Sequence, residues 1–337
     1  MSYIKSIINN KAKLFLTLIA AVAIMAMLVP ASAGNAFIQN MIIMMLLWAG
    51  LASAWNIIGG YAGQLSLGHA GFFGIGAYTV VLLAVKLEVS PWLGLIAAVF
   101  LAVVAAVIIG WPCFRLQGPF FALATVAVGE VLRILAINFS DLTYGTNGIS
   151  VKMEFGLGFM LFREKWAYGI MAIAFLALVL YAVKKLEKSR LGYYLVAIRE
   201  DQDAARSLGV KASRAKLTAY MISAAFTAIG GVIYAQYILY IDPDSVFASA
   251  LSMQMVLMTI VGGMGTLWGP VLGAVLMVPL DQFIRAYFGG SVHGLHMVIY
   301  AVILILVILV IPRGIGPTLS DWVKKYDKKA ESEGDRI

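Results

Sequence analysis

Residues 298–311 read VIYAVILILVILVI, a run that is hydrophobic on every side. A helix on the surface of a soluble protein would keep one polar face, and a strand of a membrane barrel would alternate polar and apolar residues. Hydrophobic blocks of roughly 17 to 24 residues recur along the rest of the chain, and a helix of that length crosses about 30 Å of hydrocarbon. These blocks predict an all-helical protein that crosses a membrane many times.

The composition excludes a water-soluble protein. Of the 337 residues, 62% are hydrophobic and 12% are charged, whereas soluble chains carry about 25% charged residues. The formal net charge of +8 does not indicate a nucleic-acid partner, because Lys and Arg gather in the segments that flank the hydrophobic blocks. The single cysteine, Cys113, cannot form an internal disulfide and is interpreted as a packing residue.

Ten hydrophobic segments are expected to span the membrane. Pro91 and Pro119 mark two of the starts, because a proline in the first helical turn gives up no internal hydrogen bond. The expected segments are residues 14–29, 36–58, 66–85, 92–111, 119–139, 166–183, 216–240, 247–262, 268–288 and 295–311.

The positive residues predict the orientation of the chain. One set of alternating connections holds 19 Lys and Arg residues and the other holds four. Because positive residues favour the cytoplasmic side, both termini, the 184–216 loop and the 313–337 tail are expected in the cytoplasm, and the 140–165 loop outside. Residues 1–337 are expected to form one transmembrane domain in the cytoplasmic (inner) membrane.

The N-terminus has a second interpretation. Lys11 and Lys13, the apolar stretch up to Val29 and the small residues ASA at 31–33 also resemble a cleavable signal peptide. Cleavage there would leave nine spans and the same topology, because residue 34 lies outside in both cases.

Two stretches carry far more glycine than an ordinary span: GGYAGQLSLGHAG at residues 59–71 and GGMGTLWGP at residues 262–270. Glycine lets backbones approach closely and lets a helix break, and paired breaks in two halves of a chain are typical of transporters. Tight helix packing alone is the alternative explanation. The candidate residues of a translocation pathway are Gly59, Gly60, Gly63, Gln64, Ser66, His69, Gly262, Gly263 and Gly265.

Ionisable residues inside the expected spans are few. His69 could relay protons, but a hydrogen bond to a serine or a backbone carbonyl is the simpler interpretation. Glu130 and Arg133 stand three residues apart, and Asp281 and Arg285 stand four apart, so each pair shares a helix face. Mutual pairing is the first explanation of these intramembrane charges, and a proton or ion pathway is the alternative.

The 184–216 loop contains the most specific pattern, SRLGYYLVAIREDQDAARSLGV at residues 189–210. Its acidic and glycine residues predict a short helix that Asp201 caps and Gly209 ends, and the spacing of its apolar residues predicts a narrow apolar stripe. Such a helix is either a surface helix between spans or a rigid plug for a partner's groove. The candidate partner-contact residues are Arg199, Glu200, Asp201, Asp203, Ala204, Ala205, Leu208 and Gly209.

These residues resemble the permeases of ABC importers. Arg-Glu-Asp at 199–201, followed by Ala-Ala at 204–205 and Leu-Gly at 208–209, is similar to the EAA-type coupling motif with which such permeases dock on an ATPase subunit. Asp203 stands where the motif has Glu, which keeps the charge. Together with the two glycine stretches and Gly-Thr-Asn-Gly-Ile at 145–149, the pattern is similar to the LivM branch of the branched-chain amino-acid permeases over roughly residues 36–315.

The resemblance implies a type II-like importer permease with two pseudo-related halves that moves leucine, isoleucine or valine by alternating access. The partners it implies are a second homologous permease subunit (LivH-like), two ATP-binding subunits and an external or periplasmic solute-binding protein. The chain itself is expected to bind no cofactor or metal and to be no enzyme, with ATP and Mg held by the partner subunits. The sequence agrees in one respect, since it contains no G-x-x-x-x-G-K-[ST] phosphate loop.

Three alternatives remain at this point. The same machine could carry urea, an amide or a different amino acid. An ion-coupled secondary transporter would act alone and would be expected to place acidic residues on several helices. A purely structural membrane subunit would have little need of broken helices.

Overall fold

The computed structural model describes residues 34–116, 118–151, 156–288, 295–311 and 314–318. Within these residues, seven segments are helical, long and apolar enough to cross a membrane. They are Ala36–Tyr61, which joins α2 (Ala36–Asn56) to the π-helix η1 (Ile57–Tyr61), then α3 (His69–Leu87), α4 (Pro91–Cys113), α5 (Pro119–Asn138), α7 (Lys165–Glu187), α10 (Ala212–Ile238) and Pro243–Gly262, which joins α11 (Pro243–Val246) to α12 (Ser249–Gly262).

These seven spans coincide with seven of the ten expected segments, and the helices that begin at Pro91 and Pro119 are confirmed. The expected segments 268–288 and 295–311 are the helices α13 (Gly269–Phe288) and α14 (Leu295–Val310). Neither is among the seven spans found within the described residues, in which α14 comprises 16 residues. The segment 14–29 and the signal-peptide interpretation lie outside the described residues.

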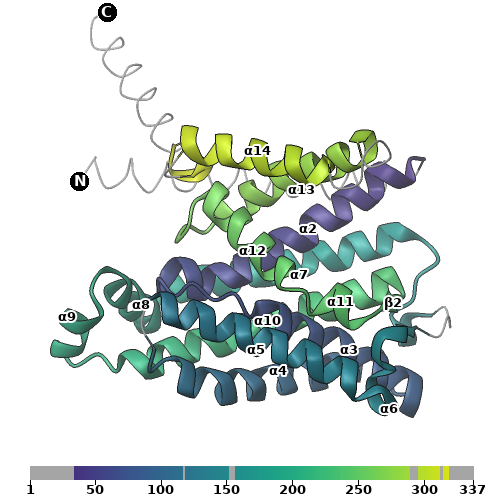
Figure 1. The fold of residues 1–337 in the computed structure, drawn as a ribbon, viewed down its shortest axis with the longest axis horizontal. Coiled ribbons are helices and arrows are strands. Elements are labelled where there is room, and N and C mark those ends of the chain that lie inside the picture. The colour runs from purple at the N-terminus through teal and green to yellow at the C-terminus, as the bar shows by residue number, and fades with distance from the viewer. Residues whose placement is uncertain (1–33, 117, 152–155, 289–294, 312–313, 319–337) are drawn as a thin grey trace, which may run out of the picture.

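The long helices run side by side, and two groups of short elements lie at their opposite ends (Figure 1). At one end the chain forms α8 (Arg190–Glu200) and α9 (Gln202–Ser207). At the other end lie α6 (Ser140–Thr143), η2 (Gly145–Asn147), η3 (Leu157–Phe159) and the two-stranded antiparallel sheet of β1 (Ile149–Ser150) and β2 (Tyr240–Ile241). The connections 184–216 and 140–165 therefore lie at opposite ends of the bundle, as expected.

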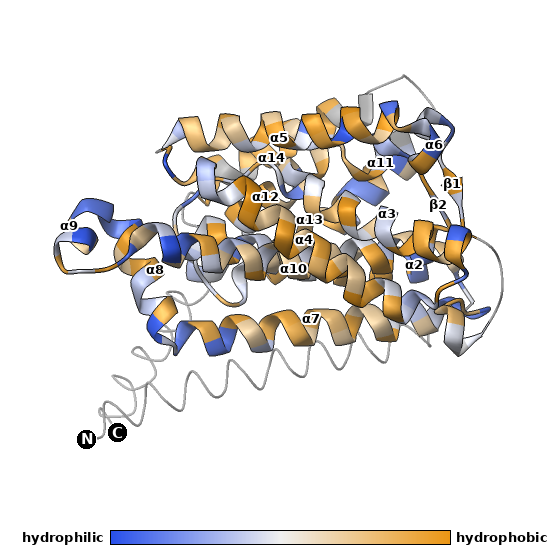
Figure 2. Ribbon diagram, turned by 90° about the horizontal axis from the view of Figure 1, so that it is seen from below, coloured by the Kyte–Doolittle hydropathy of each residue, from blue (hydrophilic) through white to orange (hydrophobic). Residues whose placement is uncertain are grey.

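Hydropathy follows this arrangement. Figure 2 shows hydrophilic residues gathered at α8 and α9 and again around α6, with hydrophobic residues along the helices between them. On the outer helices α4 and α5, large apolar side chains such as Ile96, Phe100, Ile108 and Phe120 are exposed. A surface of this kind is stable against hydrocarbon and unstable in water, so these side chains fit a lipid-facing position.

The centre of the bundle is α2, which is buried along almost its whole length and packs against α7, α10, α12 and α13. The second central helix, α10, packs against α3 and α4. Small residues permit these close contacts, since Ala98, Ala102 and Ala106 on α4 and Ala224 and Ala228 on α10 have no exposed surface. Helices inside a membrane associate through such close packing, because burial from lipid supplies little hydrophobic driving force.

Candidate functional site

The short helix α9 forms as the sequence predicts. Asp201 has an extended backbone, and its side chain accepts hydrogen bonds at 2.9 Å from the backbone N–H groups of Asp203 and Ala204. Gly209 has a φ of 86°, which ends the helix in the left-handed conformation that glycine adopts at least cost. The cap and the stop are therefore confirmed.

The prediction of an apolar stripe on α9 is wrong in part. Ala205 is only 3% exposed and packs into the main hydrophobic core, whereas Leu208 is 86% exposed and Ala204 is exposed. The helix is only six residues long, so one face rests on α8 and α10, while Ala204 and Leu208, four residues apart, face away from the protein. A partner protein can therefore reach Ala204 and Leu208, but not Ala205.

The other candidate residues of this region lie around α9. Arg199 and Glu200 end α8, and their side chains pair at 2.7 Å. Asp203 pairs with Arg206 at 3.2 Å on an exposed face. The expected group is thus brought together, and it surrounds a short exposed tip that ends at Leu208.

Both glycine stretches interrupt helices, as expected. The first continues α2 as the π-helix η1 and then runs without regular structure until α3 begins at His69. The second ends α12 at Gly262, after which Gly263 and Gly265 take positive φ angles of 118° and 70° before α13 begins at Gly269. The two breaks lie about 200 residues apart in sequence.

The structure packs the two breaks directly against each other. The side chain of Asn56 donates a hydrogen bond to the backbone carbonyl of Thr266 and accepts one from the backbone N–H of Gly265, each at 2.9 Å. A Cβ atom added to Gly60 would lie 2.4 Å from the Gly265 nitrogen and 1.8 Å from the Asn56 Oδ1. Only glycine fits at position 60, and we call the group Asn56, Gly60, Gly265 and Thr266 the glycine junction.

The glycine junction is tied to the α8–α9 end of the molecule. The Arg199 Nη1 donates a hydrogen bond of 3.1 Å to the backbone carbonyl of Gly60. A Cβ atom added to Gly265 would clash with this nitrogen. A Cβ atom added to Gly63 would clash with the Arg199 side chain. One residue at the end of α8 therefore contacts both glycine breaks.

A second connection runs through Lys216, which the sequence analysis counted as a charge of the cytoplasmic loop. Its side chain is fully buried on α10. The Nζ atom donates to the Gln202 Oε1 at 2.7 Å and to the Gln64 Oε1 at 3.4 Å, and it lies 5.3 Å from the centre of the Phe114 ring. Lys216 therefore joins the first residue of α9 to the first glycine stretch.

A helical pattern could have revealed this burial. Ala212 and Ala219 lie on the same face of α10 as Lys216, and both are buried. A lysine in a stripe of alanines points into the protein rather than toward the solvent. Asn56, another residue that the sequence analysis missed, carried no comparable signal.

Ser66 and His69 lie within the protein and do not line an open space. Both are fully buried, and the His69 ring nitrogens lie 3.0 Å from the Ser66 hydroxyl and 2.8 Å from the Ser223 hydroxyl. The Ser223 hydroxyl in turn donates to the backbone carbonyl of Ala54. The simpler interpretation of His69, a side chain satisfied by serine, is confirmed.

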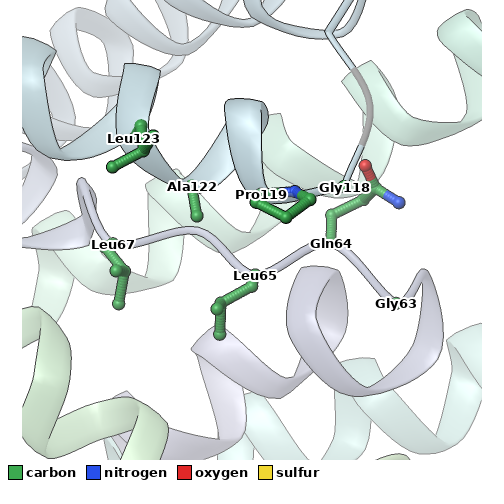
Figure 3. A pocket seen from close by; sticks show the side chains of 8 residues that line it. All are labelled: Gly63, Gln64, Leu65, Leu67, Gly118, Pro119, Ala122 and Leu123. Carbon is green, nitrogen blue, oxygen red and sulfur yellow. The ribbon is translucent and has the colours of Figure 1, made fainter.

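Of the candidate pathway residues, Gly63 and Gln64 line an open pocket of about 450 Å³. Figure 3 shows the stretch from Gly63 to Leu67 running alongside the first turns of α5. The walls are mostly apolar, because the remaining lining residues are Leu65, Leu67, Gly118, Pro119, Ala122 and Leu123. Gln64 belongs to both this pocket and the Lys216 contact, and Gly59, Gly60, Gly262 and Gly263 are packed inside the protein.

The intramembrane charges pair as expected. The Arg133 Nη2 lies 2.5 Å from the Glu130 Oε1, and the Arg285 Nη2 lies 3.0 Å from the Asp281 Oδ2. Arg133 has a further partner that the sequence analysis missed, Asp244 on α11. Within the described residues, no group of three or more His, Cys, Asp or Glu side chains is arranged to hold a metal ion.

Comparison with known proteins gives a consistent result. The family model described as "Branched-chain amino acid transport system / permease component" matches residues 37–308. The chain is 31% identical to the high-affinity branched-chain amino acid transport system permease protein LivM of Salmonella typhimurium, in an alignment that covers 96% of this chain and 79% of LivM.

The same comparison finds the LivH permease protein of Salmonella typhimurium, which is 26% identical over 80% of this chain and 90% of LivH. Among solved structures, PsaBC from Streptococcus pneumoniae in complex with Fab aligns with a TM-score of 0.44 and 14% identity, over 83% of this chain and 94% of that chain. The structural match is too weak to add to the sequence matches.

Proposed function

This chain belongs to the family of branched-chain amino acid transport system permease components, and on that premise we propose that it is the membrane-spanning subunit of an ATP-driven importer of leucine, isoleucine and valine. The chain is a multi-pass membrane protein. Its relatives include both LivM and LivH permeases, which supports pairing with a second, homologous permease. A different small solute, such as urea, an amide or another amino acid, is the alternative cargo.

The proposal extends to the rest of the machine. Two ATPase subunits bind ATP and Mg beneath the permeases, and an external solute-binding protein delivers the amino acid. The chain forms one transmembrane domain in the cytoplasmic membrane, with the 184–216 loop and both termini in the cytoplasm. The excess of Lys and Arg in that loop and at the termini supports this orientation.

One observation carries the proposal: a series of side-chain hydrogen bonds leads to the pocket from the first residue of α9, the short helix that the exposed Leu208 follows. Leu208 is 86% exposed beyond the end of α9, and a large apolar side chain in that position favours a contact with a partner protein. From α9 the contacts run from Gln202 through Lys216 to Gln64, which lines the pocket. Movement of α9 by an ATPase subunit would reach the pocket through these three side chains.

The test is ATP-driven uptake of labelled leucine by proteoliposomes that contain this chain with its partner subunits. Substitution Leu208→Asp should abolish uptake, because a charge replaces the apolar contact, and Leu208→Met should retain it. The Leu208→Asp variant should also lose the stimulation of ATP hydrolysis by the binding protein. Neither substitution should change the thermal stability of the chain, since the Leu208 side chain packs against little of it.

Two results would contradict the proposal in different ways. Normal uptake by the Leu208→Asp variant would remove the coupling role of α9 and leave the family assignment intact. Leucine uptake by the purified chain alone, driven by an ion gradient without ATPase subunits, would establish the secondary-transporter alternative. Competition by unlabelled valine, isoleucine, urea and acetamide would decide among the candidate cargoes.

A further inference from the structure

Helix α5 carries charges where a membrane helix is normally apolar. Glu130 and Arg133 lie 11 and 14 residues beyond its start at Pro119, which is roughly 17 and 21 Å along the helix axis. Their side chains are 40% and 27% exposed. Charged side chains at membrane depth almost always face water or another protein group rather than lipid, so this side of α5 does not face hydrocarbon.

The two residues form an ionic triad with Asp244, which is 67% exposed. The Arg133 Nε and Nη2 donate to the Glu130 carboxylate at 2.5–3.1 Å, and the Nη1 donates to Asp244. One cation therefore faces two anions, and the ionic triad keeps one uncompensated negative charge. An arginine carries five N–H donors, so the guanidinium can donate hydrogen bonds to a further anionic group at its outer edge.

The ionic triad and the pocket lie along the same face of α5. Pro119, Ala122, Val126, Glu130 and Arg133 follow one another at intervals of three and four residues, so they form one stripe along the helix. Pro119 and Ala122 line the pocket. The stripe leads from a mostly apolar pocket near the α8–α9 end, past an apolar valine, to charged groups nearer the opposite end.

A buried hydroxyl on α3, which packs against α11, has no hydrogen-bond partner among the described residues. Tyr78 on α3 is 5% exposed, and within the described residues its hydroxyl makes no hydrogen bond. Its ring packs against Phe247, which directly follows α11, the short helix that carries Asp244. A buried hydroxyl without a partner is costly, which favours a ligand or water that reaches it from the side of Asp244.

We propose that the ionic triad of Glu130, Arg133 and Asp244, with Tyr78 on the helix packed against α11, binds the charged head of a free amino acid during its passage. The ammonium group takes the uncompensated negative charge of the two carboxylates, and the carboxylate group takes the free N–H groups of Arg133. The apolar side chain of the amino acid lies along Val126 and Ala122. This assignment rests on the proposed function and names the residues that contact its substrate.

The test is equilibrium binding of tritiated leucine to the complete permease complex in lipid nanodiscs, without the solute-binding protein. Leucine should bind saturably, whereas 4-methylpentanoate, which lacks the ammonium group, and 3-methylbutylamine, which lacks the carboxylate, should compete about tenfold less well or worse. The double variant Glu130→Gln/Arg133→Gln replaces this pair by neutral amides and leaves Asp244, which is 67% exposed, as the remaining charge of the ionic triad. It should weaken leucine binding by about tenfold or more, and Tyr78→Phe should weaken it less.

The double variant Asp281→Asn/Arg285→Gln is the matched control, because it neutralises a comparable pair on α13, outside the stripe. It should bind leucine as the unchanged complex does. Unchanged leucine binding by Glu130→Gln/Arg133→Gln, equal competition by the two analogues, or absence of saturable binding in the unchanged complex would each overturn the assignment. ATP-driven leucine uptake by the unchanged complex tests the proposed function separately, so the two failures are distinguishable.

Discussion

The glycine junction and the ionic triad are both polar contacts between segments far apart in sequence, but they are built in opposite ways. The glycine junction uses neutral groups: a buried asparagine bonded to the backbone of residues 265 and 266. The ionic triad uses full charges that remain partly exposed. The glycine junction lies near α8, and the ionic triad lies toward the end of α5 that is far from α8.

The difference separates a structural role from a functional one. Buried hydrogen bonds to backbone groups are costly to lose, because the remaining partner has no water to replace the bond. Exposed ion pairs contribute little to stability, so stability does not explain charges on a membrane helix. Substitutions in the glycine junction should therefore change folding, and substitutions in the ionic triad should change transport.

The largest loss of stability is expected from Gly60→Ala. The added Cβ would overlap the Asn56 Oδ1 and the Gly265 backbone nitrogen, so it both strains the packing and breaks the two hydrogen bonds of Asn56. The free energy of unfolding should fall by roughly 4 kcal/mol or more. The measurement is the midpoint of thermal unfolding in detergent, followed by the loss of monodisperse protein.

Gly34→Ala is the control for this substitution, because no atom of the described residues lies within 4 Å of the Cβ it would add. It should leave the midpoint unchanged. A Gly60→Ala variant as stable as the Gly34→Ala variant would mean that the two glycine breaks do not pack as closely as the structure places them.

A smaller loss is expected from Asn56→Leu, which keeps the size of the side chain and removes its two hydrogen bonds. The Gly265 N–H and the Thr266 carbonyl would be left without partners, at a total cost of about 2 to 5 kcal/mol. Asn138→Leu removes an exposed hydrogen bond within α5 and should cost about 0.5 kcal/mol or less. Equal effects of the two substitutions would contradict a special role for the glycine junction.

Much of the fold follows from local features of the sequence. Hydrophobic length placed the spans, because each helix must cross the bilayer and satisfy its own backbone. Pro91, Pro119 and Asp201 act through neighbouring residues in the chain, so the helix ends they mark were predictable. The contacts of Asn56 with residues 265 and 266 depend on how distant helices pack, and no local pattern encodes them.

The same distinction between local features and contacts of distant segments applies to the candidate site. The members of α9 were found because a capping residue and a glycine stop leave a local pattern. The direction of Ala205 was predicted wrongly, because α8 and α10 decide which face of so short a helix is covered. The charge of Lys216 suggested an exposed loop, although the alanines on the same face of α10 indicated burial. Its partners Gln64 and Gln202 could not be predicted, because they meet it only in the folded protein.

Lys216→Met tests a third case, a buried polar group that we expect to carry the movement of α9 to Gln64 rather than to stabilise the fold. The substitution removes the cost of burying an ammonium group, and its partners Gln64 and Gln202 are half-buried and can bond to water, so the free energy of unfolding should change by about 1 kcal/mol or less. Leucine uptake should fall at least about fivefold while ATP hydrolysis persists, since α9 loses its link to Gln64. Lys216→Arg, which keeps a donor, should recover part of the uptake, and parallel loss of uptake and stability would reduce Lys216 to a structural role.

The smallest effect on stability is expected from Glu130→Gln/Arg133→Gln. The amides can still pair along α5, and the groups they replace are partly exposed, so little is gained or lost on unfolding. The midpoint of thermal unfolding should match that of the unchanged chain, while the uptake of leucine at low concentration falls. This combination is the reverse of that expected for Asn56→Leu, in which stability falls first and any loss of uptake follows from loss of folded protein. If the triad variant instead loses stability and the uptake per folded molecule is normal, Arg133 serves to fasten α11 to α5, and the surface that the amino acid contacts must be sought elsewhere along the stripe.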